Sequence, residues 1–157
     1  MEILDHPGWF WGLSLIVLTL AIHAAAVVML AFAGVRVRVR LEAGDLKEWN
    51  LILILICYIG VIGLLLALVH GIECGIWAAA YVWLGALDSP LDALLYSIDS
   101  MSTRGASGLT LQRPWRMMGA LEAVDGMLLF GVSTAYLFAV MQVQWSMLTA
   151  HAATGKS

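Results

Sequence analysis

Residues 88–114 read DSPLDALLYSIDSMSTRGASGLTLQRP and separate two long apolar stretches of the chain. Ser89-Pro90 is typical of a helix start, with serine as the N-cap and proline in the first turn. We therefore expect a short amphipathic helix over 90–101, followed by a loop of small residues over 102–108. Irregular backbone in a membrane protein persists only where protein buries it or where it lines a water-filled cavity. The stretch is predicted to be re-entrant, entering the membrane without crossing it.

The composition of the whole chain favours a membrane protein. Of its 157 residues, 62% are hydrophobic and 12% are charged, and the mean hydropathy is +0.91. An ordinary soluble domain is about 45–50% apolar and about 25% charged. The excess of apolar residues is expected to face lipid. The net charge of −3 does not suggest a nucleic-acid partner, and Cys57 and Cys74 do not form the Cys-x-x-Cys pair of a redox or zinc site.

Three apolar segments are long enough to cross a bilayer. The first covers 7–34 and contains no Asp, Glu, Lys or Arg. The second, 51–87, is long for one crossing, and we favour a single tilted or bent helix over a two-helix hairpin, which stays open. The third covers 115–145. The alternating Val-Arg pattern after the first segment fits either a strand or an extension of the first helix.

The polar stretch 35–50 sets the expected orientation. It carries Arg36, Arg38 and Arg40, and by the positive-inside rule it faces the cytoplasm. The N-terminus is then outside and the C-terminus inside, in the inner (plasma) membrane. We divide the chain into a first helix and basic loop (1–50), a pore domain (51–148) and a disordered tail (149–157).

The order of long helix, short helix, small-residue loop and long helix resembles the pore unit of potassium channels. The filter pattern of that family is T-x-T-T-V-G-Y-G-D. Here Ser100 and Ser102 stand for threonines, while Thr103 and Gly105 match directly. The resemblance covers roughly 66–143 and includes features also found in small bacterial two-transmembrane-type channels, namely Trp115-Arg116 and the stretch with Phe130, Gly131, Ser133 and Thr134.

This resemblance implies an all-α membrane protein with three transmembrane helices, a re-entrant pore helix and a filter loop. It implies an outer helix at 51–87, a pore helix at 90–101, a filter at 102–108 and an inner helix at 115–145. One subunit encloses nothing, so a closed symmetric oligomer is required, and the family implies a homotetramer. The inner helix would carry a hinge at Gly126, with a pore-lining or gating face that comprises Met127, Phe130, Thr134 and Phe138.

The filter loop departs from the potassium-channel pattern. Ser107 replaces the second glycine, Ala106 replaces the tyrosine, and Gly108 replaces the aspartate. A potassium filter needs stacked rings of backbone carbonyls, and glycine permits the backbone angles that turn them inward. We therefore predict a shorter or wider filter without ordered multi-site potassium selectivity.

Arg104 stands where the family has an aliphatic residue. An arginine at this depth is costly unless it is paired or hydrated. Four copies facing the pore would form a positive ring, which is typical of anion pores. Alternatively, an acid holds Arg104 behind the filter, with Asp99, Glu122 and Asp125 as candidates. Glu122 and Asp125 share one helical face, because they are three residues apart.

His70 and Glu73 lie three residues apart inside the second apolar segment. Histidine titrates near neutrality, so a pH-sensing role is open. We favour a polar pair that ties this helix to a neighbour, and two residues are too few for a metal site. His23 and His70 would allow a bis-histidine haem between two helices. No supporting haem motif accompanies them, and we expect no cofactor and no metal.

The function that the sequence favours is an ion channel, not an enzyme, and no residue is assigned a catalytic role. Its partners would be permeant inorganic ions, the lipid bilayer and identical subunits. Arg104 leads us to favour anion (chloride) conduction. The alternatives are a weakly selective cation channel and a membrane interaction protein that keeps the fold and does not conduct.

Overall fold

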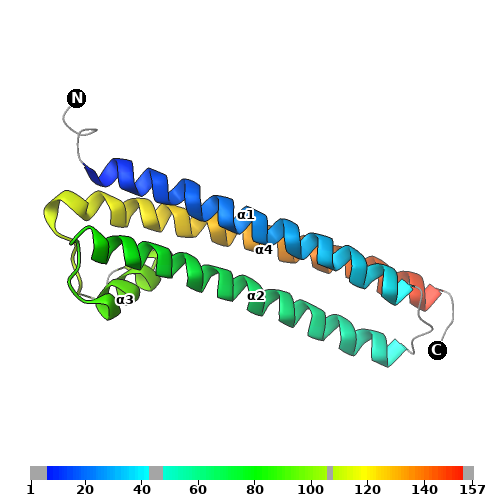
Figure 1. The fold of residues 1–157 in the computed structure, drawn as a ribbon. Coiled ribbons are helices and arrows are strands. Elements are labelled where there is room, and N and C mark those ends of the chain that lie inside the picture. The colour runs from blue at the N-terminus through cyan, green and yellow to red at the C-terminus, as the bar shows by residue number, and fades with distance from the viewer. Residues whose placement is uncertain (1–6, 43–47, 106–107, 154–157) are drawn as a thin grey trace. The chain divides into compact units, whose positions relative to one another are not determined.

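The structure is a computed structural model that describes residues 7–42, 48–105 and 108–153 (Figure 1). Helices make up nearly all of this part, and it contains no β-strand. The filter positions Ala106 and Ser107 lie outside the described residues. The helices, in chain order, are α1 (Pro7–Glu42), α2 (Glu48–Trp83), α3 (Pro90–Met101), the 3₁₀ turn η1 (Arg113–Trp115) and α4 (Arg116–Ala153).

Helices α1, α2 and α4 each carry a stretch that is long and apolar enough to cross a membrane. Among the described residues these stretches are 7–40, 52–83 and 113–146. A bilayer core about 30 Å thick needs about 20 residues of helix, so each stretch suffices with some tilt. The predicted class, an all-helical multi-pass membrane protein with three such helices, is confirmed.

The first helix extends through the basic stretch. Helix α1 continues past Gly34 and the three arginines to Glu42, so the strand alternative for 35–40 is wrong and the helical extension is correct. A helix satisfies its own backbone hydrogen bonds wherever it leaves the hydrocarbon, whereas a lone strand there has no partner.

The second apolar segment forms one helix, which excludes the hairpin alternative. Helix α2 begins at Glu48 and ends at Trp83, and the predicted bounds of 51–87 are corrected accordingly. It ends because Gly85 has a φ of +68° and the Ala86 N–H donates to the Tyr81 carbonyl at 2.8 Å. A glycine in the left-handed region just after the last turn is a common helix terminator.

The short helix agrees with the prediction for 90–101. Ser89 caps α3, and its Oγ accepts a hydrogen bond from the Asp92 N–H at 3.3 Å. The third long helix is longer than predicted. Helix α4 covers 116–153 rather than 115–145, so a disordered tail from 149 is wrong as far as Ala153. The rest of that predicted tail, 154–157, lies outside the described residues.

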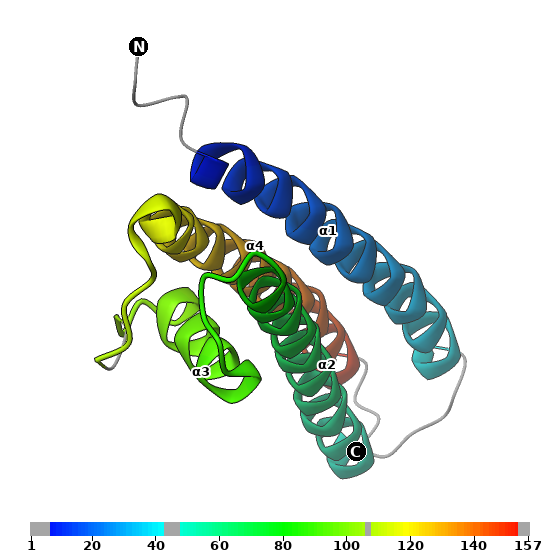
Figure 2. The ribbon, with the colours of Figure 1, turned by 60° about the vertical axis from the view of Figure 1, so that its left-hand side comes forward.

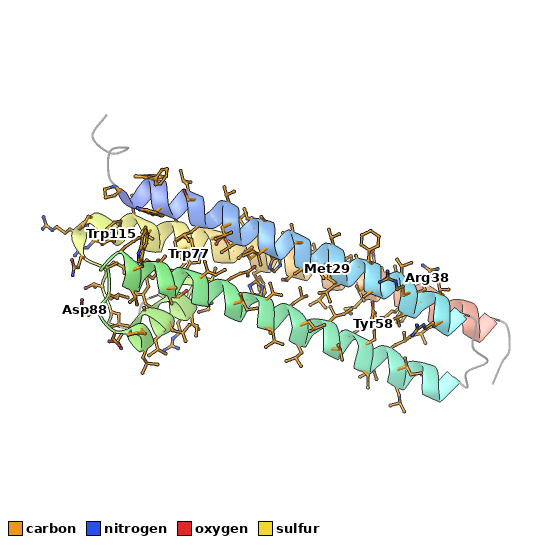
Figure 3. All side chains as sticks on the ribbon, in the orientation of Figure 1. Met29, Arg38, Tyr58, Trp77, Asp88 and Trp115 are labelled. Atoms are coloured by element: carbon orange, nitrogen blue, oxygen red, sulfur yellow. The ribbon has the colours of Figure 1, made fainter. Side chains whose placement is uncertain are left out.

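The chain divides into two compact units. Within the described residues, the first unit contains 7–24 and 68–131 apart from the gap at 106–107, which brings together parts of α1, α2 and α4 with all of α3. Figure 2 shows α3 beside the parts of α2 and α4 that belong to this unit. Trp77 points from α2 into its core (Figure 3). The fully buried apolar side chains of this core include those of Trp77, Tyr81, Met118 and Leu129.

Gly126 lets α4 approach the end of α3. A Cβ placed at Gly126 would lie 2.7 Å from the Met101 Cα, and closer still to the Met101 carbonyl oxygen. Helix α4 continues through this position without interruption. The structure therefore gives Gly126 a packing function, and its function as a hinge stays a prediction.

We expect Gly126→Ala to lower the free energy of unfolding by about 1–3 kcal/mol, as overpacking of a tight core does. The obstacle is the Met101 backbone, which cannot rotate away as a flexible side chain could. Unfolding in mixed micelles, followed by tryptophan fluorescence, measures the change. Gly131→Ala is the matched control, because a Cβ there meets nothing within 4 Å. The free energy of unfolding of Gly131→Ala is expected to rise by about 0.5–1 kcal/mol, because alanine favours a helix more than glycine does. Equal losses in both variants would contradict the packing argument.

The second unit contains 25–67 and 132–157, of which the structure describes residues up to 153 apart from 43–47. Gly34 of α1 packs directly against the Tyr58 hydroxyl of α2. An open cavity of about 220 Å³ lies next to this contact, with Arg38, Tyr136 and Gln144 among its lining residues. The Gln144 side chain is buried, and its amide makes no hydrogen bond.

Candidate functional site

Glu122 joins three helices in the first unit. It projects from α4 with no exposed surface. Its Oε2 accepts a hydrogen bond from the Tyr81 hydroxyl of α2 at 2.7 Å, and its Oε1 accepts one from the Ser97 hydroxyl of α3 at 2.5 Å. Both carboxylate oxygens are therefore occupied. The contact with Ser97 shows that Glu122 faces the short helix α3.

Tyr96 of α3 lies next to this contact. Its ring packs edge-on against that of Tyr81, with 5.4 Å between the centroids. Burial, and then the negative charge of Glu122, raise the pKa of the Tyr96 phenol. Tyr96 therefore stays a neutral hydroxyl at physiological pH.

Asp125, one helical turn further along α4, joins a different set of helices. Its Oδ2 accepts hydrogen bonds from the Thr19 hydroxyl of α1 at 2.6 Å and from the Trp77 indole N–H of α2 at 3.0 Å. These two partners come from α1 and α2 rather than from α3. The position of Asp125 behind a filter stays a prediction. Its other oxygen, Oδ1, is buried without a hydrogen bond.

Arg104 is paired with Asp99. The Arg104 Nη1 lies 3.3 Å from the Asp99 Oδ1, and the side chains of the two residues are 71% and 12% exposed. Of the three acids that the sequence offered, Asp99 is the one seen to form this ion pair. Because the Arg104 side chain is largely exposed, solvent weakens the attraction between the two charges. The Arg104 side chain therefore lies at the surface of the chain.

The start of the predicted filter forms the cap of α3. The Asp99 carbonyl accepts hydrogen bonds from the backbone N–H groups of Arg104 and Gly105, at 3.0 and 3.2 Å, and from the Ser102 hydroxyl at 3.2 Å. Thr103 has a φ of +59°, which is uncommon for a residue other than glycine. These bonds terminate the helix, so 102–105 turns back rather than extending. A filter in this loop would be short.

The two described glycines of the loop adopt left-handed backbone, although only Gly105 matches a glycine of the potassium-channel pattern. Gly105 has a φ of +81° and Gly108 a φ of +82°. The sequence did not signal the same conformation at Thr103, since threonine is stiff and rarely adopts it. Loops that hold such a residue often serve a function, because the surrounding structure must offset the strain.

The predicted pore-lining residues of α4 are all exposed on the single chain. Phe130 is 69% exposed and Phe138 is 61% exposed, and Met127 and Thr134 are exposed as well. These side chains are available to line a pore between subunits or to contact lipid. Their functions in lining and gating stay predictions.

His23, His70 and Glu73 meet inside the first unit. His23 Nδ1 lies 3.0 Å from Glu73 Oε1, and His70 Nδ1 lies 3.3 Å from Glu73 Oε2. The predicted polar pair on α2 therefore does contact a neighbour, and the neighbouring residue is His23 of α1. Sequence reasoning did not connect His23 with Glu73. The available signal was that both are isolated polar residues inside apolar helices.

The histidine rings are too close for the haem alternative. Their centroids are 5.0 Å apart and both rings face one carboxylate. A haem would have to lie between the rings, with one axial ligand on each face of the macrocycle. The shared carboxylate and the short ring separation leave no space for it.

Comparison with protein-family models, with curated proteins and with solved structures found no match to this chain.

Proposed function

We propose that this protein is an ion channel in which α3 and the loop 102–108 form a re-entrant pore helix and filter. The observation that carries the proposal is a short capped helix between two spanning helices, with its C-terminal end packed on α4 at Gly126. Its loop has left-handed backbone at Thr103, Gly105 and Gly108. Irregular backbone of this kind is accepted at membrane depth only when protein or an aqueous cavity surrounds it.

The channel is a homo-oligomer in this proposal. A single copy encloses no pore, and rotational symmetry would bring the exposed face of α4 from each copy around one axis. The potassium-channel resemblance implies four copies. Phe130 and Phe138 would then narrow the pore as apolar constrictions.

Whether the channel would conduct anions or cations depends on the net charge around Arg104. Anion conduction needs a ring of arginines whose charge is not offset, and the 71% exposure of Arg104 supports this alternative. Weakly selective cation conduction needs the charge to be offset, and the ion pair with Asp99 supports that alternative. Because each subunit carries both members of the pair, the geometry fits the weakly selective cation channel better.

The test is the reversal potential of purified protein in planar bilayers under a KCl gradient. Wild type is expected between zero and the potassium equilibrium potential, because a weakly selective cation pore still passes K⁺ in preference to Cl⁻. Asp99→Asn removes the negative charge beside Arg104 and is expected to shift the reversal potential toward the chloride equilibrium potential. Arg104→Gln removes the positive charge beside Asp99 and is expected to shift the reversal potential toward the potassium value.

Arg36→Gln is the matched control, because Arg36 is an exposed arginine of α1 outside the loop. It is expected to leave the reversal potential unchanged. A wild-type value at the chloride potential would favour anion conduction instead. Unchanged reversal potentials in both loop variants would show that the loop does not line the ion pathway. Absence of any current from a folded oligomer would favour the non-conducting interaction protein.

The proposed location is the plasma membrane, with the N-terminus outside and the C-terminus in the cytoplasm. The three arginines of α1 support this orientation through the positive-inside rule. A cytoplasm-dependent reporter fused to the C-terminus tests it. The reporter is expected to be active. An inactive reporter would show that the C-terminus lies outside the cytoplasm.

A further inference from the structure

His23, His70 and Glu73 form a cluster of metal-ligand side chains between α1 and α2. One ligand atom from each residue lies within 4.8 Å of the other two. All three residues lie inside stretches that are apolar enough to span a membrane. Intramembrane ionisable residues are expensive, and they persist where they bind or move something.

We propose that His23, His70 and Glu73 bind a divalent first-row transition metal ion of the zinc type. Two imidazoles and one carboxylate are a ligand set that zinc accepts, and imidazole also suits cobalt, nickel and copper. Ligand bonds of about 2.0–2.2 Å in a tetrahedral site place the ligand atoms about 3.3–3.6 Å apart. His23 Nδ1 lies 3.0 Å from one Glu73 oxygen and His70 Nδ1 lies 3.3 Å from the other, which is close to that spacing. One ligand atom from each of the three residues lies within 4.8 Å of the other two, so the side chains would draw closer together to coordinate an ion.

The carboxylate provides a second observation that favours an ion over a purely hydrogen-bonded cluster. Glu73 has no exposed surface, and its Oε2 accepts no hydrogen bond although His70 Nδ1 is 3.3 Å away. A buried carboxylate oxygen that accepts no hydrogen bond is costly in an apolar surrounding. Direct coordination of a cation would satisfy this oxygen.

The site has one open side. His23 and Glu73 are fully enclosed, whereas the His70 side chain is 28% exposed. Three protein ligands leave a fourth position of a tetrahedral ion free, and that position would be filled by water or by another small ligand. The bound ion would join α1 to α2 within the first unit. This inference does not depend on ion conduction, because binding is measured directly.

The experiment uses full-length protein, stripped of metal with a chelator and placed in lipid nanodiscs. Co²⁺ is titrated with detection of its visible absorption, and Zn²⁺ is then added in competition. We expect one ion per chain. His23→Asn and His70→Asn are each expected to weaken binding at least about 100-fold, since loss of an outer-shell partner already costs about 10–100-fold.

His6→Asn/His151→Asn is the matched control, because it removes the chain's other two histidines. It is expected to bind as wild type does. His70→Cys tests the geometry in a variant that keeps three ligands. It is expected to retain Co²⁺ and to add a thiolate-to-cobalt charge-transfer band that wild type lacks. Tryptophan fluorescence and gel filtration establish that each variant is folded.

Three results would overturn the proposal. The first is no stoichiometric binding by folded wild type. The second is unchanged affinity in His23→Asn and His70→Asn. The third is loss of binding in the control, which would assign the ion to the other histidines. A protein that binds one ion in this way and passes no current would keep this inference and reject the proposed channel.

Discussion

Asp125→Ala is expected to lower the free energy of unfolding by about 2–4 kcal/mol. The Asp125 Oδ2 is the common acceptor for the Thr19 hydroxyl and the Trp77 indole N–H, so one carboxylate oxygen holds α1 and α2 to α4. Thr19 can still donate to the Leu15 carbonyl at 2.8 Å. Trp77 is fully buried and its N–H would lose its acceptor, which makes that group the main source of the loss.

Asp125→Asn is the matched control for this prediction. The asparagine carbonyl can take the place of Oδ2 and accept both donors, while its NH₂ takes the place of Oδ1, which makes no hydrogen bond. We expect a change of less than about 1 kcal/mol, in line with single hydrogen bonds inside membranes. Unfolding in mixed micelles measures both variants. An asparagine variant as unstable as the alanine variant would show that the charge, rather than the two hydrogen bonds, holds the helices.

Glu122→Ala is expected to lower the free energy of unfolding by about 3–5 kcal/mol, which is more than Asp125→Ala. Both of its oxygens have donors, so the change leaves the hydroxyls of Tyr81 and Ser97 without their acceptor and opens a cavity between α2, α3 and α4. The short helix α3 has few other polar links to α4; one is the Ser100 hydroxyl, which donates to the Gly119 carbonyl at 3.0 Å. We therefore expect α3 to loosen before the spanning helices separate.

Hydrogen exchange measured by mass spectrometry tests this order of events. In Glu122→Ala, exchange is expected to rise first in α3 and its loop. Glu122→Gln keeps the size of the side chain and one acceptor oxygen. Its free energy of unfolding is expected to fall by about 1 kcal/mol, which is the contribution of a single hydrogen bond inside a membrane. Tyr81→Phe combined with Glu122→Ala forms a double-mutant cycle for the 2.7 Å bond, because each single change removes it. Purely additive losses would show that Tyr81 and Glu122 do not interact as the structure indicates.

Local chemistry explains which parts of the fold could be predicted. Ser89-Pro90 located the start of α3 because an N-cap serine and a first-turn proline act within a few residues. The end of α2 was placed too late, although Gly85 carried the signal of a glycine just after the last turn. Periodicity left helix or strand open at 35–40, because alternating Val and Arg fits both, and the backbone's need for internal hydrogen bonds in lipid decides it.

The partners of the buried acids could not be predicted in the same way. Helical spacing correctly placed Glu122 and Asp125 on one side of α4, since it depends only on the helix itself. It does not say which helix packs there, and Thr19 is 106 residues from Asp125 along the chain. The contact of His23 with Glu73, 50 residues apart, escaped prediction for the same reason. Such contacts follow from how helices pack, which a pattern within one segment does not encode.

Glu122 and Asp125 also bear on how the chain enters the bilayer during synthesis. Among the described helices, the spanning stretch of α4 is the least apolar of the three. An aspartate near the middle of an inserting helix costs up to about 3 kcal/mol at the translocon. By the time α4 leaves the ribosome, Thr19, Trp77 and Tyr81 have already been made, and they can receive its two acids. We therefore expect α4 to insert more readily when α1 and α2 are already in the membrane.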